Sequence, residues 1–380
     1  MSGIGELINN YSDTIIVYFF VICVASIFAA LSYRKNNFGD YIWRKYWFIL
    51  SFVVLLLFLG FANCGEDYYS YNRIFDNCFD WNYPHTLRIE RGYLLFNMAV
   101  KCITSSFEFF HFVWAFAILS LIYSTIAKYK EVIRPGWTIL GYTTIFMFQG
   151  LNLMRMYFAI AIIFWGIRFV IQDKKINYFF VIISAFFIHR SALCVLIPYA
   201  MWVMFSSKEK YIPKIIITLM MYGVFFILRN VVFSEFILGY QYKGITTGKI
   251  GSAQIVYAFP IFLVFLYYRI VKKEYLLDPI VSNLMVFYLS SIVFALMSYY
   301  ITTMGMVLFY FTYPYIVLPG YLMTNWSGSD EYRPWRIVSI HEIIGLCFIL
   351  YYFFRAYMMI SYIETDGLQV YSSILGFIAK

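Results

Sequence analysis

The residues best suited to chemistry are two carboxylates that stand beside long apolar stretches. Asp67 lies just after one apolar run, in a segment rich in acidic residues and tyrosines, and Glu90 precedes another. A carboxylate at the edge of an aromatic-lined cleft can take a proton from a sugar hydroxyl, while a ring such as that of Tyr71 stacks on the sugar. The alternative is structural: Asp67 would form a turn, and Glu90 would be an exposed residue capping a short helix.

Three cations form a second candidate group. Arg155 opens an apolar run, and His189 and Arg190 interrupt a later one. Cations within membrane segments are costly unless an anion meets them, so they usually mark a binding site. Arginine suits an anionic partner because its guanidinium forms two parallel hydrogen bonds and stays charged. We expect an anionic partner between Arg155 and Arg190; the alternative for Arg155 is an anchor to lipid headgroups.

The composition sets the class of protein that carries these residues. Of 380 residues, 62% are apolar and 13% charged, and the mean hydropathy is +0.72. Soluble domains carry roughly 25% charged residues, so a soluble enzyme, a disordered chain and a disulfide-stapled secreted module are excluded. Apolar runs recur from Thr14 to Ile360, and runs of about 20 residues cross the ~30 Å hydrocarbon core. The sequence therefore predicts a polytopic membrane protein with a single transmembrane domain over residues 1–380.

The predicted fold is all-α: a bundle of about 12 transmembrane helices with short interfacial helices on the external side. The predicted spans cover residues 14–33, 47–63, 107–127, 137–153, 155–171, 176–188, 191–205, 214–233, 254–271, 279–300, 304–325 and 337–360. Residues 92–104 are apolar but short for a span and include Lys101, so they are predicted to form an interfacial helix. No internal repeat is visible, which disfavours transporter folds built from inverted repeats.

The net charge of +9 follows the predicted membrane topology. Lysines and arginines cluster after every second apolar run, and this rhythm is typical of cytoplasmic loops. It places both termini outside, with a first external loop at 64–106, which holds the interfacial helix, and a second at 234–253. Nearly every candidate for chemistry then lies on the external side. Because topology explains the basic clusters, no nucleic-acid partner is expected.

The sequence predicts no cofactor and no metal site. The six cysteines form no CxxC pair and no metal-ligand spacing, and no nucleotide-binding or metalloprotease motif occurs in a plausible context. Cys64 and Cys78 fall in the first external loop, where an oxidising compartment would allow them to pair. The alternative is that both are free thiols.

Four short motifs follow one another in the first half of the chain. They are Gly65-x-Asp67-x-x-x-Tyr71-x-x-x-Phe75, Glu90-x-Gly92-Tyr93, Asn152-x-x-Arg155 and His189-x-Ser191-Ala192-Leu193. This ordered set resembles the EpsG family, which comprises Wzy-type polymerases of O-antigen, capsule and exopolysaccharide. The resemblance covers residues from about 14 to 205, with a looser fit beyond.

The resemblance implies a glycosyltransferase at the external face of the bacterial cytoplasmic membrane, surrounded by membrane lipids. It would join oligosaccharide repeat units linked to undecaprenyl pyrophosphate, with a chain-length regulator as a candidate partner. Because this donor is already activated, no nucleotide is needed. The candidate catalytic residues are Asp67, Glu90 and His189, and the candidate substrate-binding residues are Tyr71, Arg91, Arg155 and Arg190.

Other functions stay open at the level of the sequence. A transporter or flippase for lipid-linked sugars would coordinate its substrate with the external arginines and aspartate, although alternating access needs polar residues facing both sides. Another external transferase, such as an O-antigen ligase or a membrane acyltransferase, would use the same residue types. A structural or assembly protein would use them in contacts with partners.

Overall fold

Most of the chain is helical. The computed structural model describes residues 12–36, 40–83, 89–204, 220, 223, 259–272, 278–297, 304–324, 340–360, 368, 371–373 and 378–379. The described chain is 81% helical with almost no sheet, which confirms the predicted all-α class. The second external loop, predicted at 234–253, lies outside the described residues.

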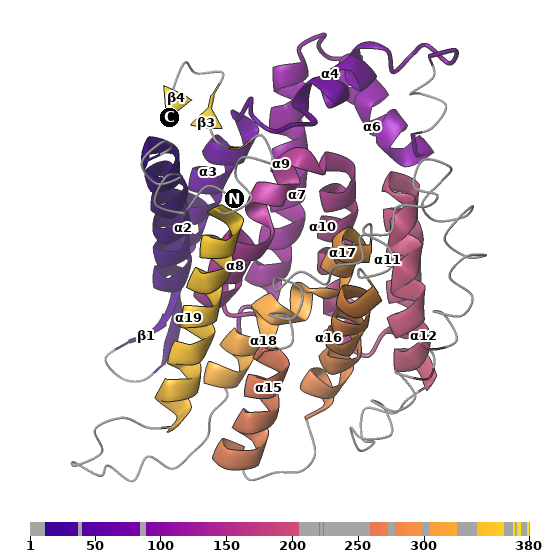
Figure 1. Cartoon of the computed structure of the whole chain (residues 1–380). Coiled ribbons are helices and arrows are strands. Elements are labelled where there is room, and N and C mark those ends of the chain that lie inside the picture. The colour runs from indigo at the N-terminus through magenta and orange to yellow at the C-terminus, as the bar shows by residue number, and fades with distance from the viewer. Residues whose placement is uncertain are drawn as a thin grey trace. The chain divides into compact units, whose positions relative to one another are not determined.

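Figure 1 shows the elements along the chain. They are α2 (Ser12–Ser32), β1 (Tyr33–Lys35), β2 (Tyr41–Trp43), α3 (Lys45–Gly60), α4 (Tyr68–Asp76), α6 (Arg91–Lys101), α7 (Phe107–Lys128), α8 (Pro135–Ile145), α9 (Met147–Asn152), α10 (Met154–Ile171), α11 (Lys175–Ile188), η1 (Arg190–Val195), α12 (Leu196–Met204), α15 (Phe259–Leu266), the π-helix η4 (Tyr267–Lys272), α16 (Pro279–Met297), α17 (Met304–Val307), η5 (Leu308–Phe311), α18 (Tyr313–Thr324), α19 (Ile340–Ile360), β3 (Tyr371–Ser372) and β4 (Ile378–Ala379).

Three described helices are long and apolar enough to cross a membrane, namely α2, α7 and α10. Several shorter apolar helices accompany them, including α3 and α11. Some predicted spans are interrupted: residues 137–153 form α8 and α9 with a break at Phe146, and residues 304–325 are divided among α17, η5 and α18. Hydropathy measures the length of an apolar run and not the continuity of its helix. The number of about 12 spans therefore stays a prediction.

The Cα positions group the chain into two compact units. Unit 1 comprises residues 1–165, 187–189 and 352–380, and unit 2 comprises residues 166–186 and 190–351. In unit 2, α16 packs against α12, α17, α18 and η5. Buried hydroxyl groups pair within it, as between Tyr178 and Tyr313 at 3.3 Å and between Ser191 and Tyr310 at 3.2 Å.

Unit 1 has two ends, which its long helices separate, and different secondary-structure elements lie at each end. The α2 helix packs against α3 and α8, and α3 packs against α7. The hairpin of β1 and β2, which the sequence did not predict, joins α2 to α3 at one end; α4 and α6 lie at the other (Figure 1). The C-terminal segment lies at the α4 end, because the Ser372 carbonyl accepts a 3.0 Å hydrogen bond from the Asn63 N–H. The 22 residues of α7 run between the two ends, a distance of about 33 Å.

Candidate functional site

Gly65 sets the course of the chain between α3 and α4. Its φ of +111° is a left-handed conformation that other residues rarely adopt. A Cβ atom at this position would also lie 2.7 Å from Asn152 Oδ1 and 3.1 Å from the Leu151 carbonyl oxygen. The same Asn152 oxygen accepts a 2.9 Å hydrogen bond from the Glu66 N–H. The turn is thus fixed against α9, and it holds Asp67 at the N-terminal end of α4.

An ion pair joins the beginning of α6 to the beginning of α10. Arg155 Nη1 donates a hydrogen bond of 2.8 Å to Glu90 Oε2. The ion pairs elsewhere in the described ranges are longer, at 3.9 and 4.0 Å. The side chain of Glu90 is 8% exposed and that of Arg155 is 27% exposed. Because the pair is largely shielded from water, each charge depends on the other for stabilisation.

A hydrogen bond from α7 holds the residue that precedes Arg155. The Trp114 indole N–H donates a 3.1 Å hydrogen bond to the Met154 carbonyl oxygen and so ties α7 to the start of α10. Trp114 is the eighth residue of α7, which puts this contact roughly 10 Å along that helix. The anion that meets Arg155 is Glu90 of the same chain. An anion between Arg155 and Arg190 stays a prediction. The sequence alone could not pair residues 65 positions apart.

The Asp67 carboxyl lies within electrostatic range of Glu66 and Arg155. Burial raises its pKa above the usual value, Glu66 adds to the rise, and Arg155 opposes it. Tyr71 of α4 and Tyr93 of α6 are both buried, with ring centroids 6.2 Å apart. Burial also raises the pKa of each phenol, so both carry their protons at neutral pH. The arrangement combines one carboxylate with an elevated proton affinity, one arginine and two phenol donors.

Two buried donors in this cluster have no partner among the described residues. They are the Nε of Arg155 and the hydroxyl of Tyr93. Burial is the largest cause of the raised Tyr93 pKa, Tyr71 adds to it, and the charge of Arg155 opposes it. Buried donors without acceptors are uncommon in folded proteins. In this cluster, the two donors are suited to hydrogen-bond an anionic or carbonyl oxygen.

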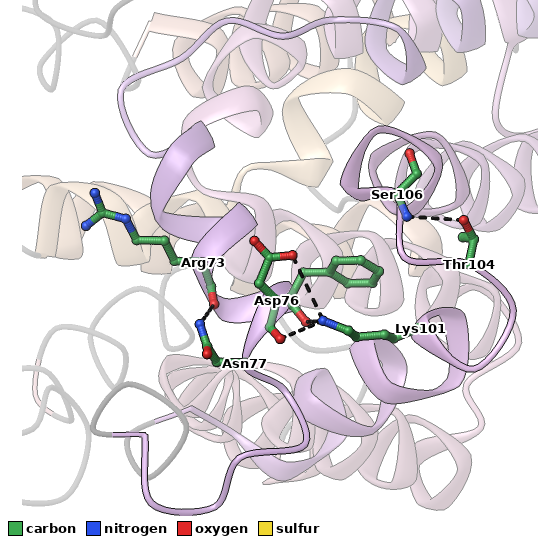
Figure 2. A network of polar contacts seen from close by, with 7 residues as sticks. Arg73, Asp76, Asn77, Lys101, Thr104 and Ser106 are labelled. Carbon is green, nitrogen blue, oxygen red and sulfur yellow. Dashed lines mark hydrogen bonds and ion pairs between the residues drawn. The ribbon is translucent and has the colours of Figure 1, made fainter.

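Both ends of α6 are fastened to neighbouring segments. The Lys101 ammonium donates hydrogen bonds to the carbonyl oxygens of Phe75 and Asp76, at 3.0 and 2.6 Å, and so closes the C-terminal end of α4 (Figure 2). At the other end, Gly92 permits close approach: a Cβ would lie 2.6 Å from the Phe187 carbonyl oxygen. The helix predicted over 92–104 is present as α6, and Lys101 is part of its attachment to α4.

The other predicted site residues lie in several different parts of the structure. His189 is half-buried and lies in unit 1 between α11 and η1, whereas Arg190 begins η1 and belongs to unit 2. Arg91 is exposed, and its guanidinium carbon lies 5.0 Å from the ring centre of Trp81. Tyr71 is 6% exposed and therefore buried, contrary to the stacking surface expected from the sequence. The position of the described Trp81, which is 52% exposed, suits that role better.

Sequence reasoning missed three contributors to this site: Trp81, Tyr93 and Asn152. Tyr93 and Asn152 stand inside the motifs Glu90-x-Gly92-Tyr93 and Asn152-x-x-Arg155, so these motifs could have identified both residues as part of the site. Trp81 lies outside every motif, and its pairing with Arg91 depends on the path of the loop after α4.

The cysteine alternatives can be decided for the described residues. Cys64 and Cys78 are both free and buried. Burial raises the pKa of the Cys64 thiol to about 12, which keeps it protonated at neutral pH. No group of three or more metal-ligating side chains occurs within the described ranges.

Comparison with known proteins assigns the family. The model of the EpsG family matches residues 45–373, which is most of the chain. The chain belongs to the EpsG family. This is the family of Wzy-type and exopolysaccharide polymerases, and the resemblance stated from the motifs is confirmed. No curated protein and no solved structure gave a match.

All seven predicted site residues of this EpsG-family protein lie inside the matched range. The apolar helices indicate a membrane protein, and the family indicates a polymerase-type function in exopolysaccharide or O-antigen synthesis. The arrangement around Asp67, Glu90 and Arg155 can accept a proton and hold an anion, two operations that glycosyl transfer from a phosphate-linked donor requires.

Proposed function

We propose that this EpsG-family protein polymerises oligosaccharide repeat units carried on undecaprenyl pyrophosphate. The reaction takes place at the external face of the bacterial cytoplasmic membrane. The observation that carries the proposal is the shielded Glu90–Arg155 pair, which lies beside a carboxyl group of raised pKa. A membrane protein retains such charges at a cost, and this cost is typical of a substrate site.

Asp67 is the proposed general base. It accepts the proton of the acceptor hydroxyl as that oxygen attacks the anomeric carbon of the donor. The raised pKa of Asp67 increases its affinity for the proton, which improves a carboxylate as a base. The bond from the anomeric carbon to the pyrophosphate oxygen breaks as the glycosidic bond forms, and the electron pair leaves with the pyrophosphate.

Arg155 is the proposed ligand of that pyrophosphate. Glu90 occupies one of its terminal nitrogens and orients the guanidinium, while the buried Nε has no acceptor among the described residues. Charge on a leaving group is stabilised best by donors that are already oriented before the reaction. Glu90 is therefore a positioning residue in this proposal. His189, Arg91 and Arg190 are proposed as further contacts to the sugars or phosphates, with Trp81 as a stacking surface.

The proposal is tested in cells that lack the gene and receive either the wild-type gene or a variant. Glu90→Gln keeps the shape of the side chain but removes the charge that orients Arg155, so we expect a shift toward single repeat units and short chains. Asp80→Asn is the matched control, because Asp80 is an exposed carboxylate of the same loop whose side chain, among the described residues, accepts a local 2.9 Å hydrogen bond from the Asn82 N–H.

The electrophoretic pattern also separates the alternative functions. A polymerase defect leaves single repeat units on the surface, a ligase defect leaves long polymer that is not attached, and a flippase defect leaves repeat units inside the cell. Long attached polymer in cells that lack the gene would reject the proposal.

A further inference from the structure

The end of unit 1 remote from Glu90 and Arg155 carries cations that are packed on aromatic rings. The guanidinium carbon of Arg134 lies 4.3 Å from the ring centre of Tyr41 and 5.1 Å from that of Tyr33. Lys130 Nζ lies 5.6 Å from the ring centre of Trp43. These contacts join the β1–β2 hairpin to the turn between α7 and α8. We call this group the basic–aromatic patch; it comprises Tyr33, Tyr41, Trp43, Lys128, Lys130 and Arg134.

The surroundings of the patch are strongly positive. The hairpin segment adds Arg34, Arg44 and Lys45, and the carboxylates of the two loops are Asp40 and Glu131. The helices α3 and α8 both begin here, with an arginine at the N-cap position and no acidic residue in the first turn. A helix N-terminus is itself positive, so these arginines raise the local potential and do not offset it.

The same end of unit 1 presents apolar surface beside the cations. In the first half of α3, Tyr46 is 54% exposed, Ile49 58% and Leu50 42%. Exposed side chains of this kind on a membrane helix contact acyl chains, and tyrosine and tryptophan gather at the level of the lipid headgroups. Cations adjacent to such a surface meet the phosphate of a lipid whose tails lie along the helix.

We propose that the basic–aromatic patch binds the headgroup phosphate of an anionic phospholipid in the leaflet at this end of the protein. Arg134 is 7% exposed and is held by two rings, so its role is to shape the patch. Lys128 is exposed and Lys130 half-buried, and their ammonium groups contact the lipid phosphate. The acyl chains lie against the exposed apolar residues of α3.

The test compares lipids bound to the purified full-length protein. The protein is equilibrated in micelles that contain equal amounts of phosphatidylglycerol and phosphatidylcholine, and native mass spectrometry measures the ratio of the two bound lipids. We expect a preference for phosphatidylglycerol that falls about tenfold in Lys128→Gln/Lys130→Gln. The conservative variant Lys128→Arg/Lys130→Arg should retain the preference, and thermal unfolding checks that each variant is folded.

The matched control is Lys174→Gln/Lys175→Gln, which removes the charge of Lys175 at the start of α11 and that of Lys174 in the loop before it. This loop shares the predicted cytoplasmic side but belongs to unit 2. An equal loss of the phosphatidylglycerol preference in the patch and control variants would mean that the preference follows overall charge. This result would overturn the proposed lipid site. An unchanged preference in the patch variant would overturn it as well.

A second arm separates a lipid site from a site for free phosphate or for an acidic protein. Inorganic pyrophosphate added to the same micelles should leave bound phosphatidylglycerol unchanged. Displacement of the lipid by pyrophosphate would show a small-anion site and contradict the proposal. Absence of any lipid preference, together with patch-dependent binding of an acidic polypeptide such as polyglutamate, would assign the patch to protein contacts instead.

Discussion

The two ends of unit 1 hold their most buried arginines, Arg155 and Arg134, in opposite ways. At the α4–α6 end, Arg155 forms a 2.8 Å ion pair with a carboxylate that is 8% exposed. At the hairpin end, Arg134 and Lys130 lie over aromatic rings, and carboxylates are few. An arginine paired at fixed distance is oriented for chemistry, whereas a cation packed on rings keeps its charge available to an anion from outside the chain.

This difference shows why counting charges in the sequence was insufficient. Both ends carry several lysines and arginines, and the positive-inside pattern accounts for those of one end. The α4–α6 end, which is predicted to be external, is distinguished by its carboxylates and by the distances between charges, which depend on how α6 and α10 meet. The following predictions test this contrast, from the largest expected effect to the smallest.

The largest effect is expected from Arg155→Ala. It removes the proposed pyrophosphate ligand and leaves the Glu90 carboxylate shielded without its partner, so polymer should disappear. The free energy of unfolding should fall by roughly 2–3 kcal/mol, somewhat less than for a fully buried pair. The measurements are the polymer ladder and thermal unfolding. In Glu90→Gln/Arg155→Ala, stability should return while polymer stays absent; recovery of both would contradict the assignment of Arg155.

Asp67→Asn should abolish polymerisation without loss of stability. The folded-state pKa of Asp67 is raised above 3.8, so its ionised form costs folding free energy at neutral pH, and the amide removes this cost. Wild-type activity should fall as the pH decreases through this raised pKa, because the base is then protonated. Activity of purified protein across pH checks this, and a normal ladder in the variant would exclude Asp67 as base.

Lys101→Met should lower stability and affect polymerisation less than the two changes above. It removes two charge-assisted hydrogen bonds to the end of α4 while keeping the apolar stem, and a loss of about 1–2 kcal/mol is expected. Thermal unfolding measures the loss, with Lys174→Met as an exposed lysine control. Equal unfolding temperatures in the two variants would show that the hydrogen bonds from Lys101 to the end of α4 contribute nothing to stability.

Lys130→Gln at the opposite end should have the smallest effect on stability. Its contact with the Trp43 ring is half-exposed, and such an interaction contributes about 0.5 kcal/mol. The same thermal unfolding assay resolves whether this loss is smaller than that of Lys101→Met. A larger loss would mean that the hairpin end depends on its cations for folding, which would reverse the contrast between the two ends.

Much of the helical content could be predicted from apolar runs. The predicted span 155–171 is present as α10, and the short segment around Lys101 forms a helix. Breaks inside apolar runs, such as that at Phe146, were missed because hydropathy does not distinguish one helix from two. The hairpin was missed because its alternation covers only three residues in each strand.

The site was predictable in its residue types and only partly in its geometry. Asp67, Glu90 and Arg155 were identified from their placement at the ends of apolar runs and from the motifs. The pairing of Glu90 with Arg155 depends on contacts such as that of Trp114 with Met154, which no local pattern encodes. The buried position of Tyr71 follows from its packing against Tyr93, which is again a tertiary contact.

The central claim is that Arg155 binds a phosphate through an oriented guanidinium, and Arg155→Lys tests it most directly. Lysine keeps the charge and can still pair with Glu90, but it lacks the planar fork that binds two phosphate oxygens. The measurement is the polymer length distribution at wild-type protein level in the membrane. The account predicts mostly single repeat units, a reduction of about tenfold or more in long chains. A wild-type ladder would show that any cation suffices at this position and would contradict the claim.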